Sequence, residues 1–332
     1  MNTTKRIQKG NCAVNKQKLK GWKKVVIILG SIPVMLVVLL AGLYLYADNK
    51  PDVHKGYNAE IETGGEIESH YLQSGTLETE KVTAPAEKPI GKYTIFYPSE
   101  LETSAQTYPM ILVVNGTGGK ATKYEPQFEL YASWGFITVG TQDKGTGSGQ
   151  TTIETLNYML EQNEDPDSVF YQRIDVKNIG VTGFSQGGAA VFNAITKYEE
   201  SGYFKTAAPL SPVCERTAAA VTDYPYRSEE VNCPVLMLAG TSGEFETESV
   251  IPLADMEEMY DDMTVPKVMA RRVGMTHDQM LYSAGGYVIA WFRWQLMGDA
   301  YAAGAFTGDE PEMMRNPLYQ NQRANLNRVW GG

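Results

Sequence analysis

A serine set between glycines is the first group in this chain that could do chemistry. Residues 183–187 read Gly-Phe-Ser-Gln-Gly, with Ser185 at the centre. The apolar residues 179–182 before this segment are typical of a buried strand, and the small and apolar residues 187–195 after it are typical of a helix. A strand, a tight turn and a helix in this order hold a serine on a strained turn as a nucleophile. The alternative is a plain strand-to-helix turn with a capping serine.

A serine hydroxyl is a weak nucleophile until a base removes its proton. The chain has three histidines, and two of them, His54 and His70, precede the predicted sheet. His277 follows the last predicted strand, residues 268–273, and a nucleophile held on such a turn has its base downstream, after the acid. We therefore predict that His277 is the base; the alternative is an ordinary surface histidine.

The acid that orients the histidine is predicted in the loop after the strand 235–239. Residues 240–246 read Gly-Thr-Ser-Gly-Glu-Phe-Glu. Glu244 is the first choice for this role, Glu246 is the second and Asp255 a distant third. The carboxylates that do not serve as the acid are interpreted as solvated loop residues.

Two backbone N–H groups are needed to bind the negative charge that develops on a substrate carbonyl. The first belongs to the residue after the nucleophile, Gln186. The second is expected in the loop at residues 115–119, Asn-Gly-Thr-Gly-Gly, which follows an apolar strand. Thr117 is the predicted donor there; the alternative is a tight turn with no catalytic role.

A second glycine-rich stretch, residues 145–149, reads Gly-Thr-Gly-Ser-Gly. It lacks the Gly-Lys-Ser/Thr ending of a phosphate-binding loop, so we interpret it as a loop at the rim of the pocket. No His, Cys or carboxylate cluster has the spacing of metal ligands. The sequence therefore predicts neither a metal nor another cofactor.

Seven apolar runs alternate with helical patterns after Pro89, which predicts a mostly parallel sheet covered by helices on both faces. The pattern predicts an α/β domain over residues 61–332. Residues 61–86 are predicted to form antiparallel edge strands. Helices are predicted at 152–162 and 286–297. The predicted strands are residues 93–97, 110–114, 136–140, 179–182, 206–210, 235–239 and 268–273.

The N-terminal region has a different composition. Residues 1–24 hold eight Lys or Arg and no acidic residue, and residues 25–47 carry no charge. A run of this length spans a bilayer as a helix, and the basic residues before it place the N-terminus in the cytoplasm. We predict a transmembrane signal anchor at 25–47, a spacer at 48–60 and an extracellular catalytic domain at the cell membrane. The alternative is a cleaved signal peptide and a secreted protein.

The rest of the chain is acidic, because it holds all 39 acidic residues and only 21 of the 29 basic ones. Such a surface argues against a nucleic-acid partner. Cys12 would lie in the cytoplasm. Cys214 and Cys233 are predicted at opposite ends of neighbouring strands, too far apart for a disulfide, and are interpreted as buried thiols.

Residues 61–300 resemble the cutinase, polyester hydrolase and platelet-activating-factor acetylhydrolase branch of the α/β-hydrolase superfamily. The motifs that carry the resemblance are Gly-Phe-Ser-Gln-Gly-Gly, Asn-Gly-Thr-Gly, Ala-Ala-Pro-Leu-Ser-Pro at 207–212 and Gly-Met-Thr-His at 274–277. The resemblance implies hydrolysis of carboxylic esters through an acyl-enzyme, without a cofactor. It assigns this chemistry to Ser185, His277, Thr117 and Gln186.

Two positions depart from that branch. Gly243 stands where an Asp is commonest, and Val213 stands where polyester-cleaving members commonly have an aromatic residue. The expected substrate is therefore a small or medium acyl ester. Two other functions stay open at this point: acyl transfer to a cell-envelope acceptor, and a low-turnover binding or sensor protein with a hydrolase fold.

Overall fold

The computed structural model describes Tyr46 and residues 48–326. The chain forms two compact units, Met1–Lys50 and Pro51–Gly332. Of the predicted basic segment and anchor, residues 1–47, only Tyr46 is among the described residues, so these two predictions lie outside the part of the chain that the structure describes. Within that part, no helix is both long and apolar enough to cross a membrane.

The second unit is built on a sheet with the strand order β1-β2-β4-β3-β5-β6-β7-β8-β9. Neighbouring strands from β4 to β8 are parallel, while β1, β2 and β9 pair antiparallel at the two edges. Each of the seven predicted strands is present, which confirms the mostly parallel α/β sheet. The strands are β1 Thr79–Pro85, β2 Lys92–Pro98, β3 Tyr108–Val114, β4 Ile137–Gly140, β5 Ile174–Phe184, β6 Phe204–Leu210, β7 Val235–Gly240, β8 Lys267–Arg272 and β9 Tyr319–Asn325.

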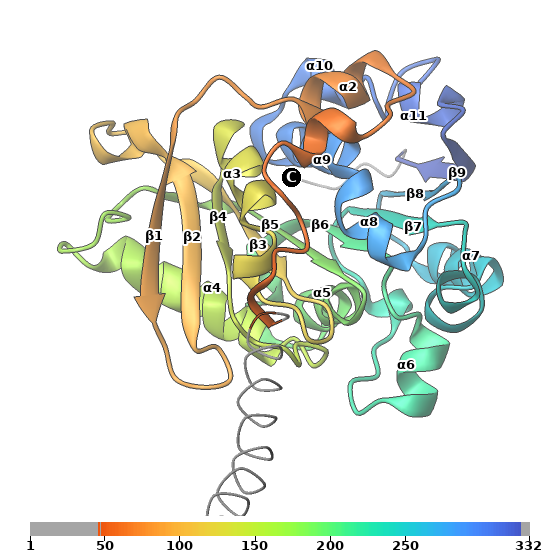
Figure 1. Cartoon of the computed structure of the whole chain (residues 1–332), viewed down its shortest axis with the longest axis horizontal. Helices are drawn as coiled ribbons and strands as arrows, with labels where there is room; N and C mark the ends of the chain where they lie inside the picture. Colours follow the sequence, from red (N-terminus) through yellow and green to blue (C-terminus); the bar gives the residue numbers. More distant parts are fainter. Residues whose placement is uncertain (1–45, 47, 327–332) are drawn as a thin grey trace, which may run out of the picture. The chain divides into compact units, whose positions relative to one another are not determined.

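Helices cover both faces of the sheet (Figure 1). Successive strand side chains point to opposite faces, so Met237 of β7 belongs to one hydrophobic core and its neighbours Leu236 and Leu238 belong to the other. The first core includes α4 Gln150–Glu164, α5 Gln186–Thr196, α6 Glu215–Val221 and α7 Leu253–Asp262. The second includes α2 Glu66–Leu72, α3 Glu125–Ser133, α8 His277–Ser283, α9 Gly285–Met297, α10 Ala300–Ala303 and α11 Glu312–Arg315. Helices α4 and α9 confirm the two predicted helices.

The region before the main sheet differs from the prediction. Of residues 61–86, only β1 is a strand, and Glu66–Leu72 form helix α2. The reason is that Ile67 and Tyr71, one helical turn apart, are both buried in the second core. The predicted spacer at 48–60 also differs, because Val53 and Tyr57 are buried and the compact unit begins at Pro51.

Cys214 and Cys233 are both free and buried, as predicted. Burial raises the pKa of the Cys233 thiol to about 12. This thiol therefore stays protonated near neutral pH, and we assign both cysteines to the hydrophobic core.

A buried carboxylate joins α2 to the far edge of the sheet. Glu68 is only 1% exposed and its Oε1 lies 2.6 Å from Nη1 of Arg272 at the end of β8. Tyr319 Oη donates to the same oxygen at 3.0 Å, while Asn316 Nδ2 and the Gly64 N–H donate to Oε2 at 2.7 and 2.9 Å. This set of contacts connects the start of the folded unit, its last strand and the strand that precedes His277.

Replacement of Glu68 tests this connection. Glu68→Ala leaves the buried Arg272 guanidinium without its counter-ion, so we expect the free energy of unfolding to fall by about 3–5 kcal/mol. Urea denaturation of the full chain measures the change. Glu66→Ala removes an exposed carboxylate from the same helix and is expected to change stability by no more than about 0.5 kcal/mol. Equal losses in the two variants would contradict the assignment.

Candidate active site

The predicted turn at Ser185 is present between β5 and α5. Ser185 has φ 60° and ψ −121°, a backbone conformation that is strained for any residue with a side chain. Its N–H donates to the carbonyl of Leu210 on β6 at 2.9 Å. The turn therefore ends the central strand abruptly and holds the serine side chain at the carboxyl edge of the sheet.

Two glycines allow this turn to pack. A Cβ at Gly187 would lie 2.3 Å from the carbonyl oxygen of Val114, and a Cβ at Gly183 would lie 2.4 Å from the carbonyl oxygen of Gly187. Both distances are far below van der Waals contact. The first turn of α5 therefore runs directly against the end of β3, which brings the loop after β3 to the nucleophile.

His277 lies beside Ser185, as predicted. Its Nε2 is 2.9 Å from Ser185 Oγ, within hydrogen-bonding range. The imidazole is buried between two aromatic rings, with the Phe184 centroid at 4.6 Å and the Phe245 centroid at 5.0 Å. His277 opens α8, and Thr276 caps that helix, so both packing and helix geometry fix the ring.

The other ring nitrogen faces a glutamate. His277 Nδ1 lies 2.6 Å from Oε2 of Glu246, which is fully buried. Oε1 of the same carboxylate accepts hydrogen bonds from Ser211 Oγ at 2.6 Å and from the Gly240 N–H at 2.5 Å. Both carboxylate oxygens are therefore occupied, and their partners hold the carboxylate in one orientation.

The structure thus brings the second-choice acid to the histidine and corrects the first choice. Glu244 is exposed, and Asp255 pairs with Arg216 through contacts of 2.6 and 2.8 Å. The chain turns at Gly243, which has φ +83°, and then winds into a π-helical turn at Phe245–Val250. That turn directs the Glu246 side chain inward. The position of a glutamate in the loop sequence does not by itself show which way its side chain points.

Two neighbours of the carboxylate were not identified from the sequence. Ser211 follows β6 with φ 39° and is fully buried. Arg271 on β8 donates from Nε to the carbonyl of Gly240 at 2.8 Å; burial lowers the pKa of Arg271, and the charge of Glu246 opposes that shift. Ser211 could have been found from the sequence, because it is a polar residue directly after β6, the strand that pairs with β7.

The loop predicted to hold the second N–H donor lies against the nucleophile. A Cβ at Gly116 would be 3.4 Å from Ser185 Cβ, and Thr117 follows it and is exposed. Gln186 begins α5, so its N–H has no partner within the helix. Asn115, at the base of the loop, donates from Nδ2 to the carbonyl oxygens of residues 141 and 143 at 3.0 and 2.7 Å.

The glycine-rich stretch 145–149 is hydrogen-bonded to the base of this loop. Thr146 Oγ1 donates to the Asn115 carbonyl at 2.7 Å, and Gly149 precedes α4 in a left-handed conformation. Among residues 48–326, no three His, Cys, Asp or Glu side chains come close enough together to hold a metal ion. The reactive groups that the structure brings together are the Ser185 hydroxyl, the His277 imidazole and the Glu246 carboxylate.

These three groups form a continuous hydrogen-bonded line from Ser185 to Glu246. The imidazole can take the serine proton at Nε2 while the carboxylate holds the N–H at Nδ1 and stabilises the imidazolium. Such a serine attacks an electrophilic carbonyl or phosphorus centre.

Comparison with known families agrees with this geometry. The family model described as PET hydrolase-like matches residues 68–307, a range that includes all three groups. No curated protein matches the chain.

Separate replacement of each candidate glutamate by glutamine distinguishes their roles. Glu246→Gln keeps the side-chain size but loses the charge that holds the imidazole, so fluorophosphonate labelling of Ser185 should slow by roughly 10²–10⁴-fold. Glu244→Gln is the matched control and should label at the original rate. Rates of labelling are followed in gels with a fluorescent probe. A slow Glu244→Gln beside a fast Glu246→Gln would reverse the correction.

Proposed function

This chain belongs to the PET hydrolase-like family of ester hydrolases with the α/β-hydrolase fold, and from this we propose that it hydrolyses small and medium carboxylic esters with Ser185 as nucleophile. The observation that carries the proposal is the line of contacts through His277, 2.9 Å to the serine hydroxyl and 2.6 Å to the Glu246 carboxylate. We assign these residues as a catalytic triad.

The reaction follows from those contacts. Ser185 Oγ attacks the ester carbonyl while His277 Nε2 takes its proton, and Glu246 stabilises the imidazolium. The N–H groups of Gln186 and Thr117 bind the oxyanion of the tetrahedral intermediate. His277 then gives the proton to the departing alkoxide, which leaves an acyl-enzyme and a free alcohol. Water attacks the acyl-enzyme with His277 again as base, and the carboxylic acid leaves as Ser185 regains its proton.

Two side chains beside the triad support a compact substrate. The Val213 N–H donates to the Ser185 carbonyl at 3.2 Å, so an aliphatic residue lies next to the nucleophile where polyester-cleaving relatives commonly have an aromatic one. Phe245 is 62% exposed, and its ring is nearly perpendicular to that of His277. Its exposed ring surface offers apolar contact to an acyl or alkyl group of modest size.

The low-turnover alternative is now less favoured. It rested on Gly243 at the position where an Asp is commonest and on the predicted membrane anchor. Glu246 offers a buried carboxylate to the imidazole instead, which removes the first of these two grounds. We find no observation that favours acyl transfer over hydrolysis.

Removal of the nucleophile tests the proposal. Ser185→Ala lacks the attacking oxygen, so both p-nitrophenyl acetate turnover and fluorophosphonate labelling should be lost. Ser249→Ala, which changes an exposed serine near the site, should keep both. A wild-type protein that is folded but shows neither activity would refute the esterase.

We further propose that residues 25–47 anchor the enzyme in the cell membrane, with the N-terminus in the cytoplasm and the catalytic unit outside. The uncharged run and the eight basic residues before it support this arrangement. The full chain should stay with membranes after alkaline carbonate washing, and protease added to intact cells should digest its catalytic unit. Release of an esterase that lacks residues 1–47 into the medium would show cleavage and secretion instead.

A further inference from the structure

Ser211 has a hydroxyl whose position is fixed by the sheet. It directly follows β6 and is fully buried, and its φ of 39° is one that residues other than glycine keep only where their surroundings hold it. Its N–H donates to the carbonyl of Leu238 on β7 at 2.7 Å, and two residues later the Val213 N–H donates to the Ser185 carbonyl at 3.2 Å. The segment is therefore bonded to β7 on one side and to the nucleophile turn on the other.

The acid of this chain needs more positioning than an aspartate would. Gly243 stands where an Asp is commonest, and the carboxylate comes instead from Glu246, whose longer side chain ends in a torsion with no sharp preference. Its Oε2 faces His277 Nδ1 at 2.6 Å, while its Oε1 accepts from the Gly240 N–H at 2.5 Å and from the Ser211 hydroxyl at 2.6 Å. One hydrogen bond to Oε1 would leave the carboxylate free to rotate about that contact, whereas two donors at the ends of different strands fix its plane.

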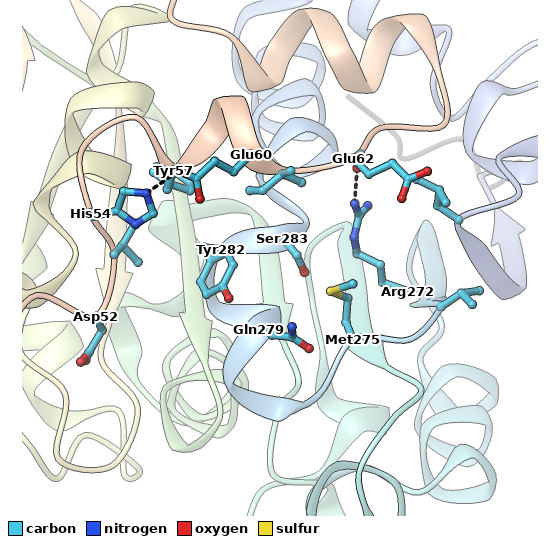
Figure 2. A pocket seen from close by; sticks show the side chains of 14 residues that line it. Asp52, His54, Tyr57, Glu60, Glu62, Arg272, Met275, Gln279, Tyr282 and Ser283 are labelled. Atoms are coloured by element: carbon cyan, nitrogen blue, oxygen red, sulfur yellow. Dashed lines mark hydrogen bonds and ion pairs between the residues drawn. The ribbon is translucent and has the colours of Figure 1, made fainter.

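The imidazole is held independently of Ser211. The Met275 carbonyl accepts the Thr241 N–H at 3.1 Å, which bonds the loop before His277 to the segment after β7. The Gln279 side chain accepts the N–H of the residue before His277 at 2.9 Å and so fixes the start of α8. Figure 2, a view of the pocket beside α8, shows Met275 on the loop after β8 and Gln279 on the helix. Loss of the Ser211 hydroxyl should therefore release the carboxylate and leave the histidine in place.

We infer that Ser211 is a positioning residue of the proposed ester hydrolysis, whose hydroxyl keeps Glu246 in the orientation that holds the His277 imidazole. The inference rests on the proposed function, because it concerns the same site. Ser211 acts through the carboxylate and not on the substrate. His277 is the base in acylation and again in deacylation, so a misplaced carboxylate slows both steps. The hydroxyl is therefore required for turnover but not for substrate binding.

Replacement of Ser211 tests the inference. Ser211→Ala removes one hydrogen bond to a charged group, so kcat for p-nitrophenyl acetate should fall about 10–100-fold while KM stays within about twofold. Fluorophosphonate labelling of Ser185 should slow by a similar factor. Ser211→Gly removes the same hydroxyl and suits the positive φ, so it should show the same loss without backbone strain. Cooperative urea unfolding of each variant shows that it is folded.

Ser228→Ala is the matched control. Ser228 is fully buried, and its Oγ donates to Oε2 of Glu215 at 2.8 Å. The variant therefore loses the same kind of buried bond from a glutamate outside the triad. It should lose a similar amount of stability and keep the wild-type kcat. An equal fall in kcat would show that the loss in Ser211→Ala follows from general destabilisation, and it would overturn the positioning role.

A double-mutant cycle shows whether Ser211 acts through Glu246. In the Glu246→Ala background the hydroxyl has no carboxylate to hold, so the addition of Ser211→Ala should slow labelling by no more than about twofold. A loss as large as that in the wild-type background would overturn the inference. Unchanged kcat in both Ser211 variants, beside an active wild type, would also overturn it and leave the esterase standing. A folded wild type without turnover or labelling would refute the esterase and the positioning role together.

Discussion

The site depends on one buried negative charge. Removal of a carboxylate from water carries a penalty of several kcal/mol unless hydrogen bonds or a counter-ion replace the lost hydration. Glu246 receives this replacement from the Ser211 hydroxyl, the Gly240 N–H and the His277 imidazole. Ser211 directly follows β6, Gly240 ends β7, and His277 opens α8 shortly after the end of β8. The carboxylate therefore requires those three strand ends to stay in register, and in return it fixes the imidazole that serves the nucleophile.

The nucleophile turn imposes a second constraint, which acts through packing. Ser185 keeps an unfavourable φ only because β5 and α5 continue on either side of it, and α5 approaches β3 closely at Gly187. The same approach brings Gly116 beside the serine. Packing in the centre of the sheet thus sets the positions of both the hydroxyl and the loop that we assign to oxyanion binding.

The alternation of apolar runs with helical patterns predicted the sheet well. A continuous apolar run is most readily buried as a central strand with helices on both faces. The nucleophile turn and the place of His277 followed from the same regularity. The choice between Glu244 and Glu246 did not, because it depends on the winding of the chain after Gly243, which is a tertiary effect. Helix α2 was missed for a similar reason: it has only seven residues, and one of its four buried side chains is the charged Glu68, so its sequence shows no clear helical period of apolar residues.

The two edge strands have a consequence for the behaviour of the protein in crowded surroundings. An exposed sheet edge can pair with the edge of another molecule, and charged or polar residues and proline discourage this. Strand β1 reads Thr-Glu-Lys-Val-Thr-Ala-Pro, and β9 reads Tyr-Gln-Asn-Gln-Arg-Ala-Asn. Each edge therefore combines a pairing-competent backbone with side chains that resist edge-to-edge aggregation. These side chains therefore disfavour the addition of strands from other molecules to a sheet whose central strands are rich in Val, Ile and Leu.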